Sequence, residues 1–393
     1  MQTTANVFIR KGAQHRLESG HPWVFQSEID RIEGDFQPGD IVDVFNHRSR
    51  LIGRGYINPR SQIIVRILTR EQEEINREFF VKRIAAAWKH RQRFLHEPNY
   101  CRLIFGEADF LPALIVDKFG DYLVVQTLAL GIDIHKETII SILDEMFQPA
   151  GIYERNDVPV RKLEGLDLRK GFLKGNFPTL LQVEENGFPF YADIENGQKT
   201  GFFYDQRENR QLLKSFATDA EVLDCFCHTG SFAIHAARYG AKSVRAIDIS
   251  DLAVEVARKN AELNGVSDIC QFEVANAFDV LRSLTEEKRQ YDVVILDPPA
   301  FTKSRSALEG AVRGYKEINL RGLKLVRPGG FLITCSCSYH MDRELFKEII
   351  IDAAKDARRT IREIEYRTQA KDHPILPAAD ETHYLKFLAV EVL

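Results

Sequence analysis

Three residues suited to acid, base or nucleophile chemistry stand where apolar strand patterns of this chain end. Asp248 and Asp297 each follow a run of aliphatic residues, and Cys337 lies at the end of the pattern FLITCSCS. Because the carboxyl ends of parallel strands meet at one edge of a sheet, these three side chains are predicted to share one crevice. Two carboxylates can orient polar ligands there, and a thiolate can act as a covalent nucleophile.

The residues before Asp248 form a βαβ pattern over 221–250. A short apolar run leads into a turn from Asp224 to Gly230, an Ala-rich helical segment follows, and a second apolar run ends at Asp248. The turn lacks the G-x-G-x-x-G pattern, which disfavours a pyrophosphate-containing cofactor and a dehydrogenase. Gly230 allows close backbone approach, and Asp248 can accept hydrogen bonds from both hydroxyls of a ribose. S-adenosylmethionine has a ribose and no pyrophosphate, so it is the predicted cofactor.

Two further segments offer polar groups to such a cofactor. Gln206 and Arg207 stand at the start of a helical pattern, where an Arg beside a Gln can clamp a carboxylate. A capped surface helix explains the same pattern about equally well. Farther along, Asn276 offers an amide to an adenine amino group, with Phe278 against the ring.

The loop after Asp297 and the cysteine pair near residue 337 carry the remaining chemistry. Pro298 and Pro299 remove two backbone donors and stiffen the loop that holds Asp297. Strand alternation puts Cys335 and Cys337 on one face, with Cys337 nearer the crevice. Buried cysteines are usually inert, which is the interpretation favoured for Cys335. The two C-x-C pairs are spaced more closely than structural zinc pairs, so no metal site is predicted.

The elements that must position these residues fall into three predicted domains. Residues 1–70 show short β-branched runs with turn signals, residues 72–190 mix helical and strand patterns, and residues 191–393 alternate strands with helices. The last range is predicted to be a doubly wound α/β domain in which the terminal run YLKFLAVEVL closes the sheet as an edge strand. The middle range is predicted to be an α+β domain with a helix whose buried stripe is Ile75, Phe79, Ile84, Trp88 and Phe94.

The N-terminal range is the only one with a net positive charge. Residues 1–70 contain 10 Lys and Arg residues against 7 Asp and Glu residues, a net charge of +3, whereas the whole chain has −4. A basic module favours contact with nucleic acid phosphates, for which the candidates are Arg10, Lys11, His15 and Arg16. For each of them, an exposed basic side chain that only solvates the surface is an equally good interpretation.

The composition argues against several classes of protein. No apolar run approaches the ~20 residues that span a bilayer, and the N-terminus lacks the apolar segment of a signal peptide. Six cysteines in 393 residues are too few for a disulfide scaffold. A cytoplasmic protein without membrane contact is therefore predicted. The edge strand and the β-rich module are compatible with a homodimer.

Several short motifs of this chain occur together in one known family. They are RKG, HPWVF, GDIVDV, GQKTGFFYDQR, LDCFCHTGSF, AIDIS, LDPPAF, RGYKEIN and TCSCS. With them the chain resembles, over nearly its whole length, the bacterial large-subunit ribosomal RNA cytosine-5 methyltransferases that carry an N-terminal PUA domain. The resemblance implies a Rossmann-like methyltransferase domain, ribosomal RNA as partner, and Cys337 as nucleophile with Asp297 as its acidic partner. It also implies that the cofactor is held by Phe203, Gln206, Arg207, Asp224, Phe226, Gly230, Asp248, Asn276, Ala277 and Asp297.

The chemistry of that family leaves alternatives open for this chain. In the family, a thiolate adds to C6 of cytosine and C5 is methylated; loss of the C5 proton then releases the enzyme. If the last motif is aligned as T-C-S, Cys335 becomes the nucleophile instead. Amino-group methylation of guanine or adenine in RNA would need the diproline loop but no cysteine. A non-catalytic RNA-binding protein would bind S-adenosylmethionine without transferring its methyl group.

Overall fold

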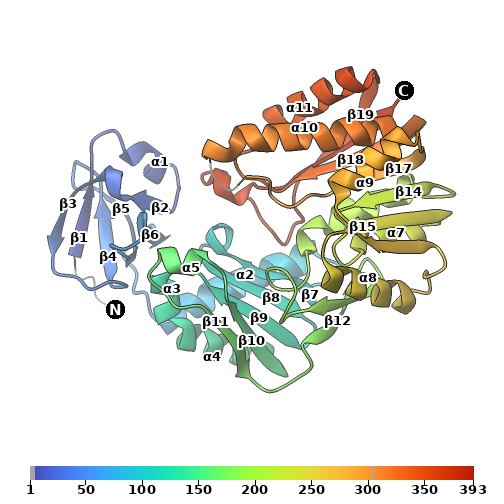
Figure 1. Ribbon diagram of the computed structural model, residues 1–393. Helices are drawn as coiled ribbons and strands as arrows, with labels where there is room; N and C mark the ends of the chain where they lie inside the picture. The colour runs from blue at the N-terminus through green and yellow to red at the C-terminus, as the bar shows by residue number, and fades with distance from the viewer. Residues whose placement is uncertain (1–4, 303–304) are drawn as a thin grey trace. The chain divides into compact units, whose positions relative to one another are not determined.

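The chain passes back and forth between two structural units, and neither unit is one continuous segment (Figure 1). The computed structural model describes residues 5–302 and 305–393. Unit 1 comprises Met1–Leu181, Asp193–Tyr204 and Lys371–Thr382, and unit 2 comprises Gln182–Ala192, Asp205–Ala370 and His383–Leu393. Unit 1 therefore contains nearly all of the first two predicted domains together with two short returns of the chain.

Unit 1 begins with a six-stranded sheet and a short helix. Its elements are β1 (Ala5–Ile9), α1 (Gln14–Glu18), β2 (Trp23–Phe25), β3 (Ile29–Gly34), β4 (Ile41–Phe45), β5 (Leu51–Ile57) and β6 (Ile63–Thr69). The strand order is β2-β6-β5-β4-β1-β3, with β1 parallel to β4 and the other pairs antiparallel. Val7, Ile9 and Val44 face a core that also includes Leu17 of α1, as β-branched residues favour in strands.

A second sheet of five strands follows in unit 1. Its elements are α2 (Arg77–Phe94), β7 (Tyr100–Phe105), β8 (Leu114–Phe119), β9 (Tyr122–Thr127), α3 (Leu130–Ile134), α4 (Lys136–Phe147), β10 (Gly151–Asn156), α5 (Val160–Leu163) and β11 (Arg169–Lys174). The strand order is β11-β10-β9-β8-β7. Apolar side chains of α2 and α4 share one core with the strands.

The predicted apolar stripe of α2 is correct at Phe79 and Ile84 but wrong at Phe94. The first two side chains are buried, whereas Phe94 is 44% exposed in the last turn of the helix. The buried position in that turn belongs to Arg91, which donates a hydrogen bond of 2.7 Å to the carbonyl oxygen of Asp372. This bond holds the second returning segment within unit 1.

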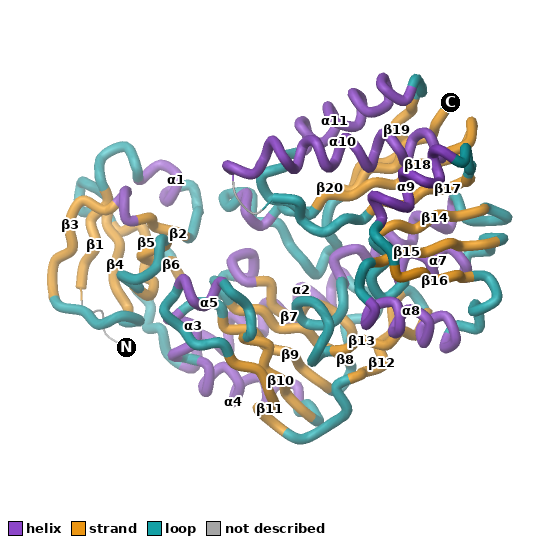
Figure 2. The backbone as a smooth tube through the Cα atoms, in the orientation of Figure 1, coloured by secondary structure: helices purple, strands orange, loops and turns teal. Residues whose placement is uncertain are grey.

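Unit 2 contains the remaining α-helices and nearly all of the remaining strands of the described residues (Figure 2). They are β12 (Leu180–Glu185), β13 (Phe188–Asp193), α6 (Arg207–Gln211), β14 (Glu221–Cys225), α7 (Ser231–Arg238), β15 (Ser243–Asp248), α8 (Asp251–Leu263), β16 (Cys270–Val274), α9 (Ala277–Glu286), β17 (Tyr291–Leu296), α10 (Leu308–Leu325), β18 (Val326–Ser336), α11 (Arg343–Ala357), β19 (Ile361–Arg367) and β20 (Lys386–Val392). Strands β12 and β13 pair with each other, and their ends at Leu181 and Asp193 belong to unit 1.

The main sheet of unit 2 has seven strands in the order β16-β15-β14-β17-β18-β20-β19. Strands β14 to β18 are parallel, and β20 runs antiparallel to both of its neighbours. Helices α9, α10 and α11 share one core with the strands, while α7 and α8 contact β15 and β16. This arrangement confirms the predicted doubly wound α/β fold.

The predicted edge position of the C-terminal run is wrong. β20 lies between β18 and β19, and β19 is the edge strand. Six of the seven residues of β20 are buried, which is typical of a strand covered on both faces, whereas no residue of β19 is buried. The charged sequence IREIEYR suits an edge, because charged residues discourage pairing with another chain.

Candidate active site

The carboxyl ends of β14 and β17 mark the point at which the strand order of the sheet reverses. β15 and β16 continue from β14 on one side, and β18 continues from β17 on the other. The Asp297 N–H donates a hydrogen bond of 3.3 Å to the Cys225 carbonyl oxygen and so joins the two ends. Doubly wound sheets bind their ligands at such a reversal.

Asp224 is a fully buried carboxylate in β14 at this reversal. Its exposed fraction is 0%, and neither oxygen has a hydrogen-bond partner of normal geometry among the described residues. Burial, with a smaller contribution from the charge of Asp297, raises the pKa of Asp224 well above its usual range. Because an unpaired buried carboxylate is unfavourable for folding, it is typical of a site where a ligand supplies the donor.

The loop after β14 has an unusual backbone and contacts Asp248. Phe226, His228 and Gly230 have φ angles of 66°, 49° and 79°, all in the left-handed region. The His228 N–H donates to one oxygen of Asp248 at 2.8 Å, and the Ser250 N–H donates to the other at 2.9 Å. Each oxygen keeps a second lone pair, so Asp248 can still accept bonds from ribose hydroxyls.

Packing within the protein accounts for the glycine at position 230. A Cβ atom there would lie 2.8 Å from Cε1 of Phe272 and 3.1 Å from Cβ of Ala257. The predicted reason for this glycine was close approach of the backbone to the cofactor. The structure adds close approach to α8 and β16 and the positive φ angle as reasons for this glycine, and its contact with the cofactor stays a prediction.

The three upstream residues predicted to hold the cofactor differ in their contacts. The Gln206 side chain donates to Oδ1 of Asp297 at 3.1 Å. Arg207 is buried, and its Nε lies 4.0 Å from a carboxylate oxygen of Glu185, so a protein carboxylate is already near it. Phe203 belongs to unit 1, whereas Gln206 and Arg207 belong to unit 2.

The segment from Asn276 to Phe278 begins α9. Asn276 accepts a hydrogen bond of 2.9 Å from the Phe278 N–H and thereby caps the helix. Ala277 is buried, whereas Asn276 is exposed and can still contact a ligand. The Phe278 ring is 6.2 Å from that of Phe226 and 5.8 Å from that of Phe301. Aromatic surface therefore stands next to the loop after β14.

The structure places the two candidate nucleophiles in different environments. Cys335 is fully buried in β18, and burial, together with nearby Asp297, raises the pKa of its thiol well above the usual range. Cys337 follows the end of β18 and is partly exposed, with its sulfur 3.8 Å from the carbonyl oxygen of Pro298. Desolvation, followed by the charge of Asp205, raises the pKa of Asp297 to about 6.

All six cysteines lie in the described ranges, where none of them forms a disulfide; Cys337 is partly exposed, whereas the other five are buried. Those ranges contain no group of three or more His, Cys, Asp or Glu side chains that could hold a metal ion. Nor does any helix in them have the length and apolar content needed to cross a membrane.

Sequence reasoning missed the side chains that fix the turn carrying Cys337. The Tyr315 hydroxyl lies 2.9 Å from Oγ of Ser336 and 3.1 Å from Oγ of Ser338. Lys386 in β20 donates to the Ser338 carbonyl oxygen at 2.7 Å. The signals were the tyrosine of RGYKEIN and the single lysine of KFLAVEV. Because β20 was expected at the edge, nothing indicated that these residues meet.

Three of the four residues predicted to contact RNA are exposed in unit 1. Arg10, Lys11 and His15 are exposed, whereas Arg16 is only 33% exposed. Arg16 donates to both carboxylate oxygens of Glu28, at 2.9 and 2.8 Å. This ion pair gives Arg16 a structural role.

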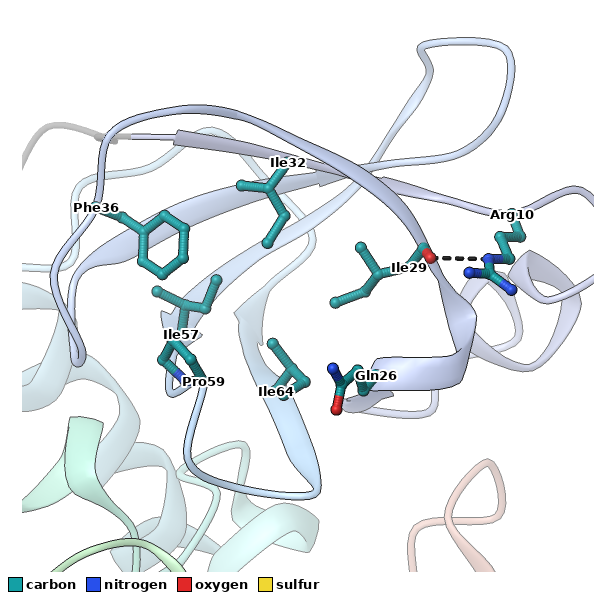
Figure 3. A pocket seen from close by; sticks show the side chains of 8 residues that line it. All are labelled: Arg10, Gln26, Ile29, Ile32, Phe36, Ile57, Pro59 and Ile64. Atoms are coloured by element: carbon teal, nitrogen blue, oxygen red, sulfur yellow. Dashed lines mark hydrogen bonds between the residues drawn. The ribbon is translucent and has the colours of Figure 1, made fainter.

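Arg10 also lines a cavity of about 290 Å³ in the first sheet of unit 1 (Figure 3). Its Nε donates to the Ile29 carbonyl oxygen at 2.8 Å. The other lining residues are mostly apolar: Gln26, Ile29, Ile32, Phe36, Ile57, Pro59 and Ile64. Of the residues predicted for catalysis or cofactor binding, none lines this cavity.

Comparison with known proteins matches both parts of the chain. Residues 7–70 match the PUA-like domain family, and residues 166–390 match the S-adenosylmethionine-dependent methyltransferase family. A Streptococcus mutans protein assigned as a SAM-dependent methyltransferase has the same fold, with a TM-score of 0.84, 19% identity and coverage of 99% of this chain and 100% of that one. The predicted N-terminal PUA-like domain is confirmed. The fold and crevice define an S-adenosylmethionine-dependent methyltransferase.

Closer relatives narrow this class. The chain is 43% identical to ribosomal RNA large subunit methyltransferase I of Shewanella amazonensis, over 98% of this chain and 99% of that protein. It is 42% identical to the Vibrio cholerae protein of the same name, over 99% and 100%. The chain therefore belongs to the family of the proteins named ribosomal RNA large subunit methyltransferase I.

S-adenosylmethionine is the cofactor of this class, as predicted, and the crevice fits it. The unpaired carboxylate of Asp224 suits a cationic donor such as the ammonium group of the cofactor, and Asp248 retains acceptors for its ribose hydroxyls.

Proposed function

We propose that this chain methylates C5 of a cytosine in large-subunit ribosomal RNA through a covalent adduct with Cys337. The names of its 42–43% identical relatives support the RNA substrate. The cytosine-C5 assignment rests on the partly exposed Cys337, whose sulfur lies 3.8 Å from the Pro298 carbonyl oxygen. Methylation of an amino group would need no thiol at this place.

The chemistry explains why a thiol is needed. Cytosine C5 is too weak a nucleophile to take a methyl group directly. S-adenosylmethionine supplies an electrophilic methyl group. The thiolate of Cys337 uses an electron pair to form the S–C6 bond, which breaks the C5–C6 double bond and makes C5 nucleophilic. After C5 has been methylated, a base removes the C5 proton, the double bond re-forms, and the sulfur leaves with its electron pair.

Asp297 is suited to hold the base during this addition. Its pKa of about 6 means that a fraction of the carboxyl groups is protonated near neutral pH. The protonated form can donate to N3 of cytosine, and the ionised form can accept from the 4-amino group. The hydrogen bond from Gln206, at 3.1 Å, orients the carboxyl group.

Roles in cofactor binding and RNA binding complete the proposal. Asp224 would accept from the ammonium group, Asp248 from the ribose, and Asn276 from the adenine amino group. The remaining proposed cofactor contacts are Phe203, Gln206, Arg207, Phe226, Gly230 and Ala277. Arg10, Lys11 and His15, which are exposed, would contact RNA phosphates.

Trapping with 5-fluorocytosine tests the proposal. An RNA fragment of the large subunit that contains this base is mixed with the protein and S-adenosylmethionine, and the products are run on a denaturing gel. Fluorine at C5 blocks the proton-removal step, so the adduct should accumulate. Wild type should give the adduct and C337S should not, and C337S should methylate ordinary RNA at least about 10⁴-fold more slowly.

Two other results would contradict this assignment. If the adduct persists in C337S and disappears in C335S, the nucleophile is Cys335. If neither variant changes methyl transfer and wild type forms no adduct, the enzyme methylates an amino group instead.

A further inference from the structure

Lys386 is a lysine in the interior of the main sheet of unit 2. It is 2% exposed and stands opposite Ser336 in the pairing of β20 with β18. Its Nζ donates to the carbonyl oxygens of Ser338 and Tyr384, each at 2.7 Å. The ammonium group is therefore tied to the turn that carries Cys337.

No carboxylate of the described residues lies within ion-pair distance of this ammonium group. Burial lowers the pKa of Lys386 to about 8, and the nearby groups Cys337 and Asp342 partly oppose this change. A buried cation without a counter-ion is unfavourable for folding. A neutral donor could form hydrogen bonds to the same two carbonyls with a smaller desolvation penalty. The position therefore calls for an anion that forms during function.

We propose that Lys386 is a positioning residue whose ammonium group stabilises the thiolate of Cys337 and thereby sets the pH range in which this sulfur reacts. The proposal rests on the function proposed for Cys337. Two of the three ammonium donors bind carbonyls, and the described residues provide no acceptor for the third. Tyr315 fixes the same turn from α10 through Ser336 and Ser338.

Four other titratable groups that the structure describes near this pair carry no positive charge. Burial raises the pKa of Tyr315 to about 12 and that of Cys335 well above its usual range, so both are neutral at neutral pH. Asp342, before α11, carries a carboxylate, as does Asp297 when ionised. Of these groups only Lys386 is cationic, and carboxylates disfavour a second anion. Removal of the Lys386 ammonium group should therefore raise the pKa of the Cys337 thiol.

Alkylation of the full-length protein by iodoacetamide tests the proposal without RNA. The rate at Cys337 is measured from pH 5 to 10 by mass spectrometry of its peptide, with C337S to identify the signal. In wild type the midpoint should lie below the ~8.5 of a free thiol. K386M should raise it by about one to three pH units and slow the reaction at pH 7 by about tenfold or more. K386R should stay closer to wild type, and K214M, which removes an exposed lysine of unit 2, should match it.

An equal midpoint in K386M and wild type would overturn the proposal, provided that K386M still binds S-adenosylmethionine by calorimetry. If K386M does not fold, the pH midpoint of alkylation in wild type tests the proposal. A midpoint at or above ~8.5 overturns the proposal. A lower midpoint that K386R retains supports it. The outcome is distinct from that of the 5-fluorocytosine experiment. A Lys386-dependent thiolate with no RNA adduct would sink cytosine-C5 chemistry alone, whereas an adduct with no effect of Lys386 would sink this inference alone.

Discussion

Buried charged side chains differ in their partners between the second sheet of unit 1 and the crevice of unit 2. In unit 1, fully buried Arg91 meets Asp109 at 2.5 Å. In unit 2, Asp224 and Lys386 are buried to a similar extent, yet among the described residues neither forms an ion pair. The paired charges have their partners within the fold, and the unpaired charges are suited to partners that arrive with cofactor and substrate. Burial alone therefore does not mark a functional charge; burial without an internal partner does.

The largest expected effect comes from breaking a pair in unit 1. R91M should lower the free energy of unfolding by about 3–5 kcal/mol, because it leaves Asp109 buried without its partner. Denaturant unfolding measures this effect. The matched control is R77M, which breaks the exposed pair of Arg77 and Glu145 and should leave stability nearly unchanged. Equal losses in the two variants would remove the basis of the comparison.

Removal of the Asp224 carboxylate in unit 2 should raise the free energy of unfolding, the opposite of the effect of R91M. D224N should raise the free energy of unfolding of the cofactor-free protein by about 0.5–2 kcal/mol and weaken S-adenosylmethionine binding. The folded-state pKa of Asp224 is raised, so its contribution to stability is present at low pH and lost as pH rises. The gain should therefore be larger at pH 8 than at pH 5. Thermal unfolding at both pH values and calorimetry measure the two effects, and a less stable D224N at pH 8 would contradict the prediction.

Substitution of Asp297 should give an effect no larger than about 2 kcal/mol, and this effect should depend on pH. The pKa of an unfolded aspartate carboxyl group is about 3.9, whereas burial raises the pKa of Asp297 in the folded protein to about 6. Its stabilising contribution is thus fully present below about pH 4 and is lost as pH rises through about 6. The stability of D297N relative to wild type should increase by about 2 kcal/mol between pH 4 and pH 7. D268N, at an exposed position, should show no such trend.

Most of the methyltransferase fold could be predicted from the sequence because local residue patterns specify its strands and helices. Aliphatic runs that end in Asp248 and Asp297 specify parallel strands, and their carboxyl ends must share an edge once the order of strands is doubly wound. The position of Cys337 follows from the same rule. The proximity of the strand end to the crevice distinguished Cys337 from Cys335 in the sequence, and in the structure Cys337 is partly exposed whereas Cys335 is buried.

What the sequence could not provide was the pairing of distant elements. The hydrophobic run of β20 was compatible with an edge or an interior position, and its pairing with β18 brings Lys386 to the turn that carries Cys337. At Phe94, helical spacing continued the apolar stripe, but the helix end is exposed and buries Arg91 instead. Gly230 was noted for its backbone freedom, while its contact with Phe272 depends on how the loop packs against β16.

The repeated passage of the chain between the two units has a consequence for biosynthesis. Unit 1 includes Lys371–Thr382, and the interior of the main sheet of unit 2 includes β20. Domains usually complete their folding in the order in which they are translated. Here neither unit has all of its segments until translation has passed residue 382, so an N-terminal nascent fragment cannot form a finished unit. Both units should therefore complete their folding together, late in synthesis, and the surroundings of the Cys337 sulfur would form only in a nearly full-length chain.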